Sequence, residues 1–357
     1  MTASFGGRAA SVRFDRVTKA FGDFVAVDAV SFEVAPGSLA TLLGPSGCGK
    51  TTTLRMIAGL ELSTAGRIWI GDHDVTGLPA TRRDVSMVFQ SYALFPHMTV
   101  QENVAYGFTV SGTPKAEAKE RADQGLALVG LKGFGARLPS ELSGGQQQRV
   151  AVARALVLEP EVLLFDEPLS NLDAKLRRRV REEIRDIQRS LGLTVVYVTH
   201  DQEEALAVSD KVIVMRNAAI AQEGTPRELY EQPADRFVAD FIGDANLVDA
   251  EILETDGDLA RVSIGGIEVR APGRGLPAGP VLTAIRPEAV LLDAQGEEGL
   301  AGTVVKAAYL GKHLEYTVDS PVGELFVIDR RVAAPLSPGT GVAIRFGDRI
   351  ALVPDDR

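Results

Sequence analysis

The segment GPSGCGKT, residues 44–51, has residue types and spacing suited to holding phosphate groups. Its glycines let the backbone pass close to phosphate oxygens and direct several N–H groups inward. The ammonium group of Lys50 can pair with terminal phosphates, and the hydroxyl group of Thr51 can bind Mg²⁺. An apolar run at Leu39–Leu43 predicts a strand before the segment, and Lys50–Ala58 predicts a helix after it. The nucleotide-binding residues expected here are Gly44, Pro45, Ser46, Gly47, Cys48, Gly49, Lys50, Thr51 and Thr52.

Two carboxylates follow a second apolar run, in VLLFDE at residues 162–167. A phosphate loop needs an acidic metal partner at the end of a neighbouring strand, and Asp166 has that position. Glu167 comes next and is placed to orient or deprotonate an attacking water. Exposed strand-end carboxylates with no chemical role are the alternative interpretation.

Gln90 and His200 also follow predicted strands, at Val85–Phe89 and Thr194–Val198. Each residue alone is more often structural. Ligands of open parallel sheets bind beyond the carboxyl ends of the strands, so these two residues are expected beside Lys50 and Asp166. His200 could then reach a terminal phosphate.

A second helix start suited to anions occurs in LSGGQQQRV, residues 142–150. Ser143, Gly144 and Gly145 precede a long helical pattern, and free N–H groups at a helix N-terminus attract negative charge. The alternative is an ordinary serine cap followed by flexible glycines.

Together these motifs resemble, in order, those of the ATP-binding cassette (ABC) ATPases over residues ~11–240. The resemblance implies a P-loop ATPase with a RecA-like core and a helical subdomain at about 91–160. It also implies a homodimer in which each ATP lies between one copy's phosphate loop and the other copy's LSGGQ. Further roles implied by the resemblance are contacts to ATP from Ser143, Gly144, Gly145 and Gln146, adenine stacking by Phe21, an interface position for Asp173, metal binding by Thr51, Gln90 and Asp166, and catalysis by Glu167, His200, Gln90 and Lys50.

Apolar runs alternate with helical patterns up to about residue 241, which is typical of an α/β fold. One helix is expected to bury Leu172, Val180 and Ile184 and to leave Arg177–Arg181 in water. Short β-type runs then occupy residues 242–357 and predict a small all-β, OB-like barrel. The expected domains are therefore an ABC domain at 11–241 and an accessory β-barrel domain at 242–357.

The bulk composition excludes several classes of protein. The net charge of −10, with 11 Lys/Arg against 18 Asp/Glu in residues 243–357, argues against nucleic-acid binding. No apolar run reaches the ~18 residues of a spanning helix, and the N-terminus does not resemble a signal peptide. A single cysteine, Cys48, fits a reducing compartment. These features favour a soluble cytosolic protein that reaches a membrane only through a partner.

The segments at 82–107 and 224–248 resemble the ATPase subunits of bacterial importers that use a substrate-binding protein. This resemblance implies location at the cytoplasmic face of the inner membrane and permease subunits that dock near Tyr92–Met98. Local packing of Tyr92, Leu94 and Phe95 is the alternative for that segment. FIGDANL and YLGKHLEYTV resemble ferric-iron, polyamine or phosphonate systems more than sugar importers. Less favoured alternatives are an ABC ATPase of repair or translation and a regulatory module that does not hydrolyse ATP.

Overall fold

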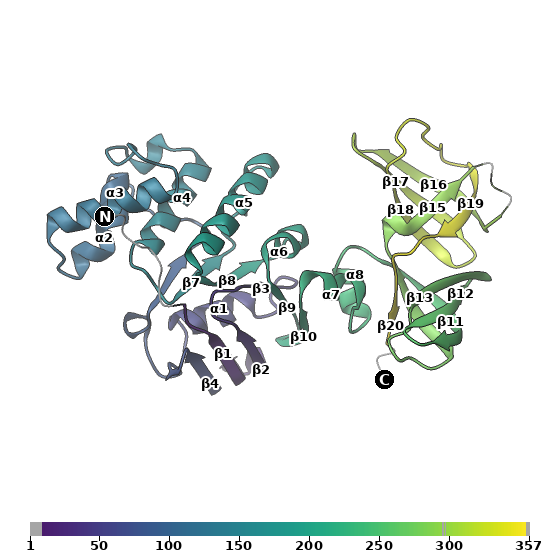
Figure 1. Cartoon of the computed structure of the whole chain (residues 1–357), viewed down its shortest axis with the longest axis horizontal. Coiled ribbons are helices and arrows are strands. Elements are labelled where there is room, and N and C mark those ends of the chain that lie inside the picture. Colours follow the sequence, from purple (N-terminus) through teal and green to yellow (C-terminus); the bar gives the residue numbers. More distant parts are fainter. Residues whose placement is uncertain (1–8, 295, 297, 355–357) are drawn as a thin grey trace. The chain divides into compact units, whose positions relative to one another are not determined.

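The computed structural model describes residues 9–294, 296 and 298–354. The chain forms two compact units, one ending at Pro226 and the other beginning at Arg227 (Figure 1). Within the described residues, no helix has both the length and the apolar character needed to cross a bilayer.

A six-stranded sheet forms the centre of the first unit, in the order β10-β9-β3-β8-β7-β6. All neighbours are parallel except β10, which pairs antiparallel with β9. Its central strands are buried on both faces, which explains their unbroken apolar sequences. The strands are β3 (Leu39–Leu43), β6 (Val85–Val88), β7 (Val162–Asp166), β8 (Thr194–Thr199), β9 (Lys211–Arg216) and β10 (Ala219–Gly224). Because β3, β6, β7 and β8 are parallel, the residues that follow them lie along one edge.

A second, antiparallel sheet packs on one side of the first unit. Its strands are β1 (Val12–Phe21), β2 (Phe24–Val34), β4 (Ala65–Ile70) and β5 (His73–Asp74). Helix α1 (Lys50–Ala58) shares one apolar core with this sheet and with one face of the six-stranded sheet, through Leu54, Met56 and Ile57. The start of α1 is thereby fixed at the carboxyl end of β3.

Helices cover the other face of the six-stranded sheet (Figure 1). Three of them, α2 (Val100–Val110), α3 (Lys115–Leu128) and α4 (Gly144–Leu156), fall within the segment expected to form the helical subdomain. Helix α2 begins with a capping box, in which Thr99 and Glu102 each satisfy the other's backbone N–H. Helix α6 (Gln202–Val208) follows β8, and short 3₁₀ turns occupy Ala80–Arg82 and Pro139–Glu141.

Helix α5 (Ala174–Leu191) is strongly amphipathic, as its sequence predicts. Val180 and Ile184 are buried in the core shared with α4. The outer face carries exposed i,i+4 pairs such as Arg178–Glu182. Arg177 differs from this outer face: it donates to the carbonyl of Leu172 and pairs with Asp201.

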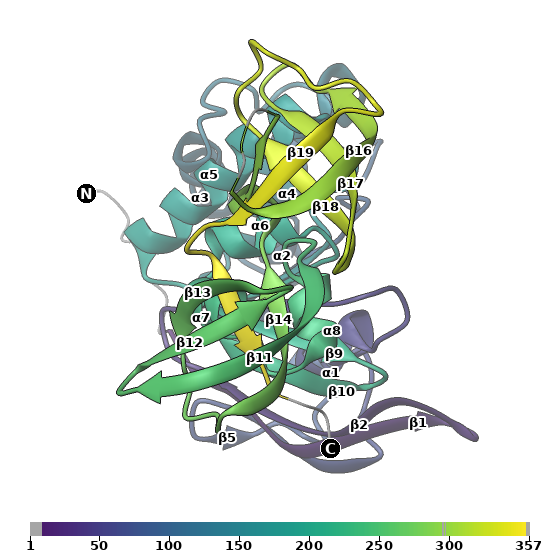
Figure 2. The same cartoon turned by 90° about the vertical axis from the view of Figure 1, so that its right-hand side faces the viewer.

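The second unit is a small all-β, OB-like domain preceded by short helices α7 (Pro226–Glu231) and α8 (Arg236–Phe241). Two five-stranded antiparallel sheets, ordered β13-β12-β11-β14-β20 and β15-β19-β16-β17-β18, share one apolar core (Figure 2). The strands are β11 (Asn246–Asp256), β12 (Leu259–Ile264), β13 (Ile267–Pro272), β14 (Gly279–Ile285), β15 (Val290–Asp293), β16 (Leu300–Tyr309), β17 (Leu314–Ser320), β18 (Gly323–Asp329), β19 (Gly341–Phe346) and β20 (Ile350–Val353), with a 3₁₀ turn at Pro287–Ala289.

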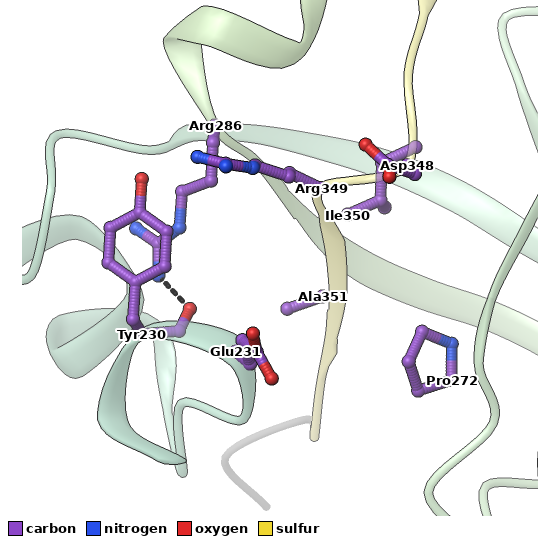
Figure 3. Close-up of a pocket in the computed structure, with 8 residues that line it drawn as sticks. All are labelled: Tyr230, Glu231, Pro272, Arg286, Asp348, Arg349, Ile350 and Ala351. Carbon is purple, nitrogen blue, oxygen red and sulfur yellow. Dashed lines mark hydrogen bonds between the residues drawn. The ribbon is translucent and has the colours of Figure 1, made fainter. Parts of the chain in front are cut away.

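Arg286 joins these short helices to the strands (Figure 3). Its buried guanidinium donates to the carbonyls of Tyr230, Ala239 and Ile242 and lies 3.9 Å from the ring centroid of Tyr230. An adjoining pocket of about 420 Å³ is lined by residues of α7, such as Glu231, and by residues of the β-strands, such as Ile350. Residues 227–241 therefore belong to the second unit, whereas the boundary expected from the sequence is at 242.

Candidate functional site

The loop between β3 and α1 has a backbone that only glycine can adopt at two positions. Gly44 has φ 156°, and a Cβ there would lie 2.3 Å from the carbonyl oxygen of Met215. Gly49 has φ 106°, and its Cβ would lie 2.5 Å from the carbonyl oxygen of Ala26. The loop therefore curls tightly against its surroundings, a geometry that directs successive backbone N–H groups toward a phosphate.

Lys50 is the first residue of α1 and is buried. Its Nζ donates to the carbonyls of Gly44, at 2.7 Å, and Pro45, at 2.9 Å, and lies 3.7 Å from Sγ of Cys48. The ammonium group is thus held inside the loop, at the N-terminus of a helix whose dipole also favours anions.

Asp166 ends β7 beside the phosphate loop. Burial raises the pKa of this carboxyl and neighbouring Glu167 raises it further, whereas Arg55 and a hydrogen bond from Thr51 lower it. A hydroxyl and a carboxylate therefore lie near each other where the sequence predicts Mg²⁺. Such a hard-oxygen pair fits an ion that keeps waters and phosphate oxygens as its other ligands.

Glu167 and His200 contact each other across two neighbouring strand ends. Oε2 of Glu167 lies 3.1 Å from Nδ1 of His200. The backbone of Glu167 has φ 44°, an unusual value for glutamate, and its N–H bonds to the carbonyl of Val198 at 3.1 Å. Strained conformations of this kind occur where a side chain must be aimed, and here the carboxylate is directed toward His200.

Gln90 lies beyond the end of β6 and bonds to the loop that follows Glu167. Its Nε2 donates to Oγ of Ser170 at 3.1 Å, and its backbone carbonyl accepts from Nδ2 of Asn171 at 3.0 Å. Gln90, Glu167 and His200 therefore lie on adjacent segments at the carboxyl edge of the parallel sheet.

The LSGGQ segment begins α4 and has structural roles of its own. Oε1 of Gln146 accepts from the N–H of Ser143 at 2.9 Å, which closes the first turn. A Cβ on Gly145 would lie 2.9 Å from Cδ1 of Leu176, so glycine permits close packing on α5. Asp173 caps α5 by accepting from the N–H of Leu176. Ser143 and Gly144 are exposed, so their polar groups are open to a ligand.

In one copy of the chain the expected residues form two groups: the phosphate loop with the residues at the carboxyl edge of the parallel sheet, and the start of α4. Among the described residues, no hydrogen bond joins 143–146 to the phosphate loop at 44–52. Phe21, at the end of β1, is also separate. This residue is 47% exposed, and Nζ of Lys19 lies 4.5 Å from the centroid of its ring.

A buried cluster of three residues packs beside His200. Tyr197 and Thr199 both donate to the buried carboxylate of Glu204. Burial is the main cause that raises the pKa of both Glu204 and Tyr197. This cluster fixes the backbone on both sides of His200. Its positions belong to ordinary strand and helix patterns, so no local signal could have revealed it.

The segment expected to dock a permease is only partly exposed. Tyr92 is buried and Leu94 packs against the helical core, so local packing accounts for these two residues. A groove of about 1090 Å³ is lined by the end of the segment and by α2 and α3. His97, Met98 and Tyr106 are among its lining residues.

A parallel sheet with a glycine-rich phosphate loop after one strand and an Asp–Glu pair after its neighbour defines a P-loop nucleotide hydrolase. Family models agree: residues 27–170 match the ABC transporter family and residues 283–353 match the TOBE domain.

Known relatives are similar over nearly the whole chain. An Fe(3+) ions import ATP-binding protein, FbpC, of Rhizobium etli is 61% identical over 96% of this chain and 97% of its own. A spermidine/putrescine import ATP-binding protein, PotA, of Rubrobacter xylanophilus is 47% identical over 97% and 94%. A solved dimeric ATP-binding cassette, in a post-hydrolysis state with ADP and Pi, is 31% identical, with a TM-score of 0.54 over 60% of this chain and 99% of that one. The chain belongs to the ABC transporter family, as an ATP-binding and ATP-hydrolysing import subunit.

Proposed function

We propose that this ATPase powers the import of ferric iron. The observation that carries the proposal is the 61% identity over nearly the full length to an iron-import ATP-binding protein, against 47% to a polyamine-import protein. The import subunit would act at the cytoplasmic face of the membrane through permease subunits, which receive the ion from a substrate-binding protein.

The chemistry assigned to each side chain follows from its position. Lys50 and the phosphate-loop N–H groups bind the β- and γ-phosphates, and Phe21 stacks on the adenine. Thr51, Asp166 and Gln90 would hold Mg²⁺, which neutralises phosphate charge when bound. Glu167 takes the proton of the attacking water, and His200, hydrogen-bonded to Glu167, contacts the γ-phosphate.

Two copies would complete each site. The exposed start of α4, with Ser143 and Gly144, is a helix end suited to an anion, and within the described residues no hydrogen bond joins it to the phosphate loop of its own chain. The solved dimeric cassette with ADP and Pi supports a dimer for this family. In this arrangement Ser143, Gly144, Gly145 and Gln146 bind the γ-phosphate held by the partner copy, and Asp173 lies at the interface.

The groove beside α2 and α3 suits a short helix from the permease. Its volume of about 1090 Å³ is at the upper end of the range for small-molecule pockets, and its lining mixes apolar groups such as Met98 and Tyr106 with charged groups such as Glu102 and Lys119. We expect a charge at Met98 to abolish uptake and to spare ATP hydrolysis by the isolated chain.

Uptake by a deletion strain tests the proposed substrate. Cells lacking this chain should lose uptake of radiolabelled ferric iron, and the wild-type chain should restore it. The Lys50→Ala variant should fail to restore it, because the phosphate loop loses its ammonium group. If deletion leaves iron uptake intact and removes spermidine uptake, the iron assignment is wrong and the polyamine relative is the better guide.

A further inference from the structure

The segment that follows Gln90 contains two consecutive residues in a costly backbone conformation. Tyr92 has φ 62° and Ala93 has φ 46°. The left-handed region costs about 1–2 kcal/mol for each residue that is not glycine. Two in succession persist only where the surroundings hold them.

Arg154 provides that restraint from helix α4. Its Nη2 donates to the carbonyl of Tyr92 at 2.8 Å, and its Nη1 donates to the carbonyl of Ala93 at 2.6 Å. The two nitrogens of one planar guanidinium therefore bind two successive carbonyls, a geometry that a single ammonium cannot reproduce. Within the described part of the chain no carboxylate pairs with Arg154, and burial lowers its pKa. Its positively charged guanidinium therefore binds the backbone carbonyls of this turn.

Helix α4 has functional groups at its other end. It begins at the LSGGQ motif, and Arg154 lies about 16 Å further along the same helix. Val150, Val152 and Leu156 pack this helix in the helical core, so its two ends move together. Arg154 consequently connects the part expected to bind the partner copy's ATP with the turn that leads to the permease groove.

The rest of the segment is held by other elements. Asn103 of α2 accepts from the N–H of Phe95 and donates to the carbonyls of Phe95, Met98 and Thr99. Residues 95–99 therefore form one rigid piece with α2. Its connection to Gln90 runs through the two strained residues that Arg154 holds.

We propose that Arg154 is a positioning residue that couples ATP-driven movement of α4 to the permease-docking segment. This proposal rests on the docking function proposed above. When α4 shifts as its first turn engages a γ-phosphate, the guanidinium carries the Tyr92–Ala93 turn, and with it the edge of the groove at Met98. The ATP site itself does not use Arg154.

The test compares hydrolysis by the isolated chain with hydrolysis by the transporter complex that copurifies with a tagged chain, reconstituted in liposomes with its binding protein. Arg154→Met should lower the stimulated rate about 3- to 30-fold and change the isolated rate less than about 2-fold. Arg154→Lys should lie between Arg154→Met and the wild type. Arg121→Met is the matched control, because it removes an arginine that pairs with Glu159 in the same helical lobe.

A second substitution distinguishes loss of coupling from loss of stability in the Arg154→Met variant. Glycine at position 93 adopts the left-handed conformation without steric cost, so Ala93→Gly should restore the melting temperature and complex assembly of Arg154→Met. It should not restore stimulation, because the turn is still detached from α4. Normal stimulation in the Arg154→Met/Ala93→Gly variant overturns the coupling role. If Met98→Glu leaves stimulation intact, the docking function fails and the coupling role fails with it.

Discussion

Replacing Glu167 with glutamine removes one negative charge beyond β7 and keeps the size of the side chain. In the structure the carboxylate lies 3.1 Å from Nδ1 of His200 and raises the pKa of Asp166. The amide oxygen of glutamine can still accept a hydrogen bond from His200. It cannot accept a proton from water, so we expect the chemical step to be lost while ATP still binds.

The effect of Glu167→Gln on catalysis is expected to be larger than its effect on folding stability. Loss of a general base lowers turnover by about 10²- to 10⁴-fold, which is about 3–5 kcal/mol of barrier. The effect on stability is smaller, because the side chain of His200 is 60% exposed and such pairs contribute at most about 1 kcal/mol. Removing the charge also relieves repulsion on Asp166, which offsets part of that loss. Folding should therefore be unchanged within about 1 kcal/mol.

The assay measures ATP turnover by the purified chain, together with its mass by light scattering. Glu167→Gln should turn over at least about 100-fold more slowly and form an ATP-dependent dimer that persists. Glu203→Gln is a matched control, because Glu203 is an exposed glutamate three residues beyond His200. Wild-type turnover by Glu167→Gln would remove Glu167 from the role of base, and a monomer at saturating ATP would remove the shared site.

Three further predictions concern neighbouring positions. Asp166→Asn should raise the melting temperature of the ATP-free chain at pH 7 by about 1–3 °C and abolish Mg²⁺-dependent ATP binding. Because the pKa of Asp166 is raised in the folded chain, this carboxyl group destabilises the wild type as the pH rises through that pKa. The difference in melting temperature between the variant and the wild type should therefore shrink on acidification. An unchanged difference at low pH would contradict this. Gly145→Ala places a Cβ 2.9 Å from Leu176, which should cost up to about 2 kcal/mol in thermal unfolding and weaken ATP-dependent dimerisation, whereas wild-type dimerisation would exclude Gly145 from the interface. Asn103→Ala leaves the N–H of Phe95 unpaired and should lower the free energy of urea unfolding by about 2–4 kcal/mol; a loss below about 0.5 would show that water replaces the side chain.

Strands β3, β6, β7 and β8 of the parallel sheet could be predicted from the sequence because each is a short apolar run followed by residues with a chemical role. The predicted limits of β3 and α1 agree with the structure, and β7 and β8 each extend one residue further, to Asp166 and Thr199. Parallel pairing then fixes which ends meet, so Gln90, Glu167 and His200 could be placed on one edge before any contact was known.

Contacts between side chains and distant carbonyls could not be predicted in this way. In the sequence Arg154 and Arg286 look like ordinary charged positions. In the structure both donate hydrogen bonds to backbone carbonyls far away in the chain. The sequence is equally consistent with Tyr92 as a docking residue or as a core residue, because a turn has no periodic pattern of apolar residues. In the structure Tyr92 is buried. The helices at 227–241 have no sequence feature that assigns them to the second unit, since that assignment depends on Arg286.

The free energy that would hold the proposed dimer closed can be worked out from the contacts that α4 makes to one γ-phosphate. A hydrogen bond to a charged group contributes about 1.5–3 kcal/mol, so two N–H contacts from α4 supply about 3–6 kcal/mol for each ATP. Hydrolysis followed by release of the phosphate removes the atoms that accept those bonds. A change of about 4 kcal/mol shifts an equilibrium about 10³-fold, enough to convert a mainly closed dimer into a mainly open one. In the proposed arrangement Lys50 and His200 contact the γ-phosphate from the chain that holds the ATP, so the contacts that are lost between the two copies are those of α4. The helix that loses the phosphate is the helix that carries Arg154, so opening of the dimer and release of the docking turn would be one movement.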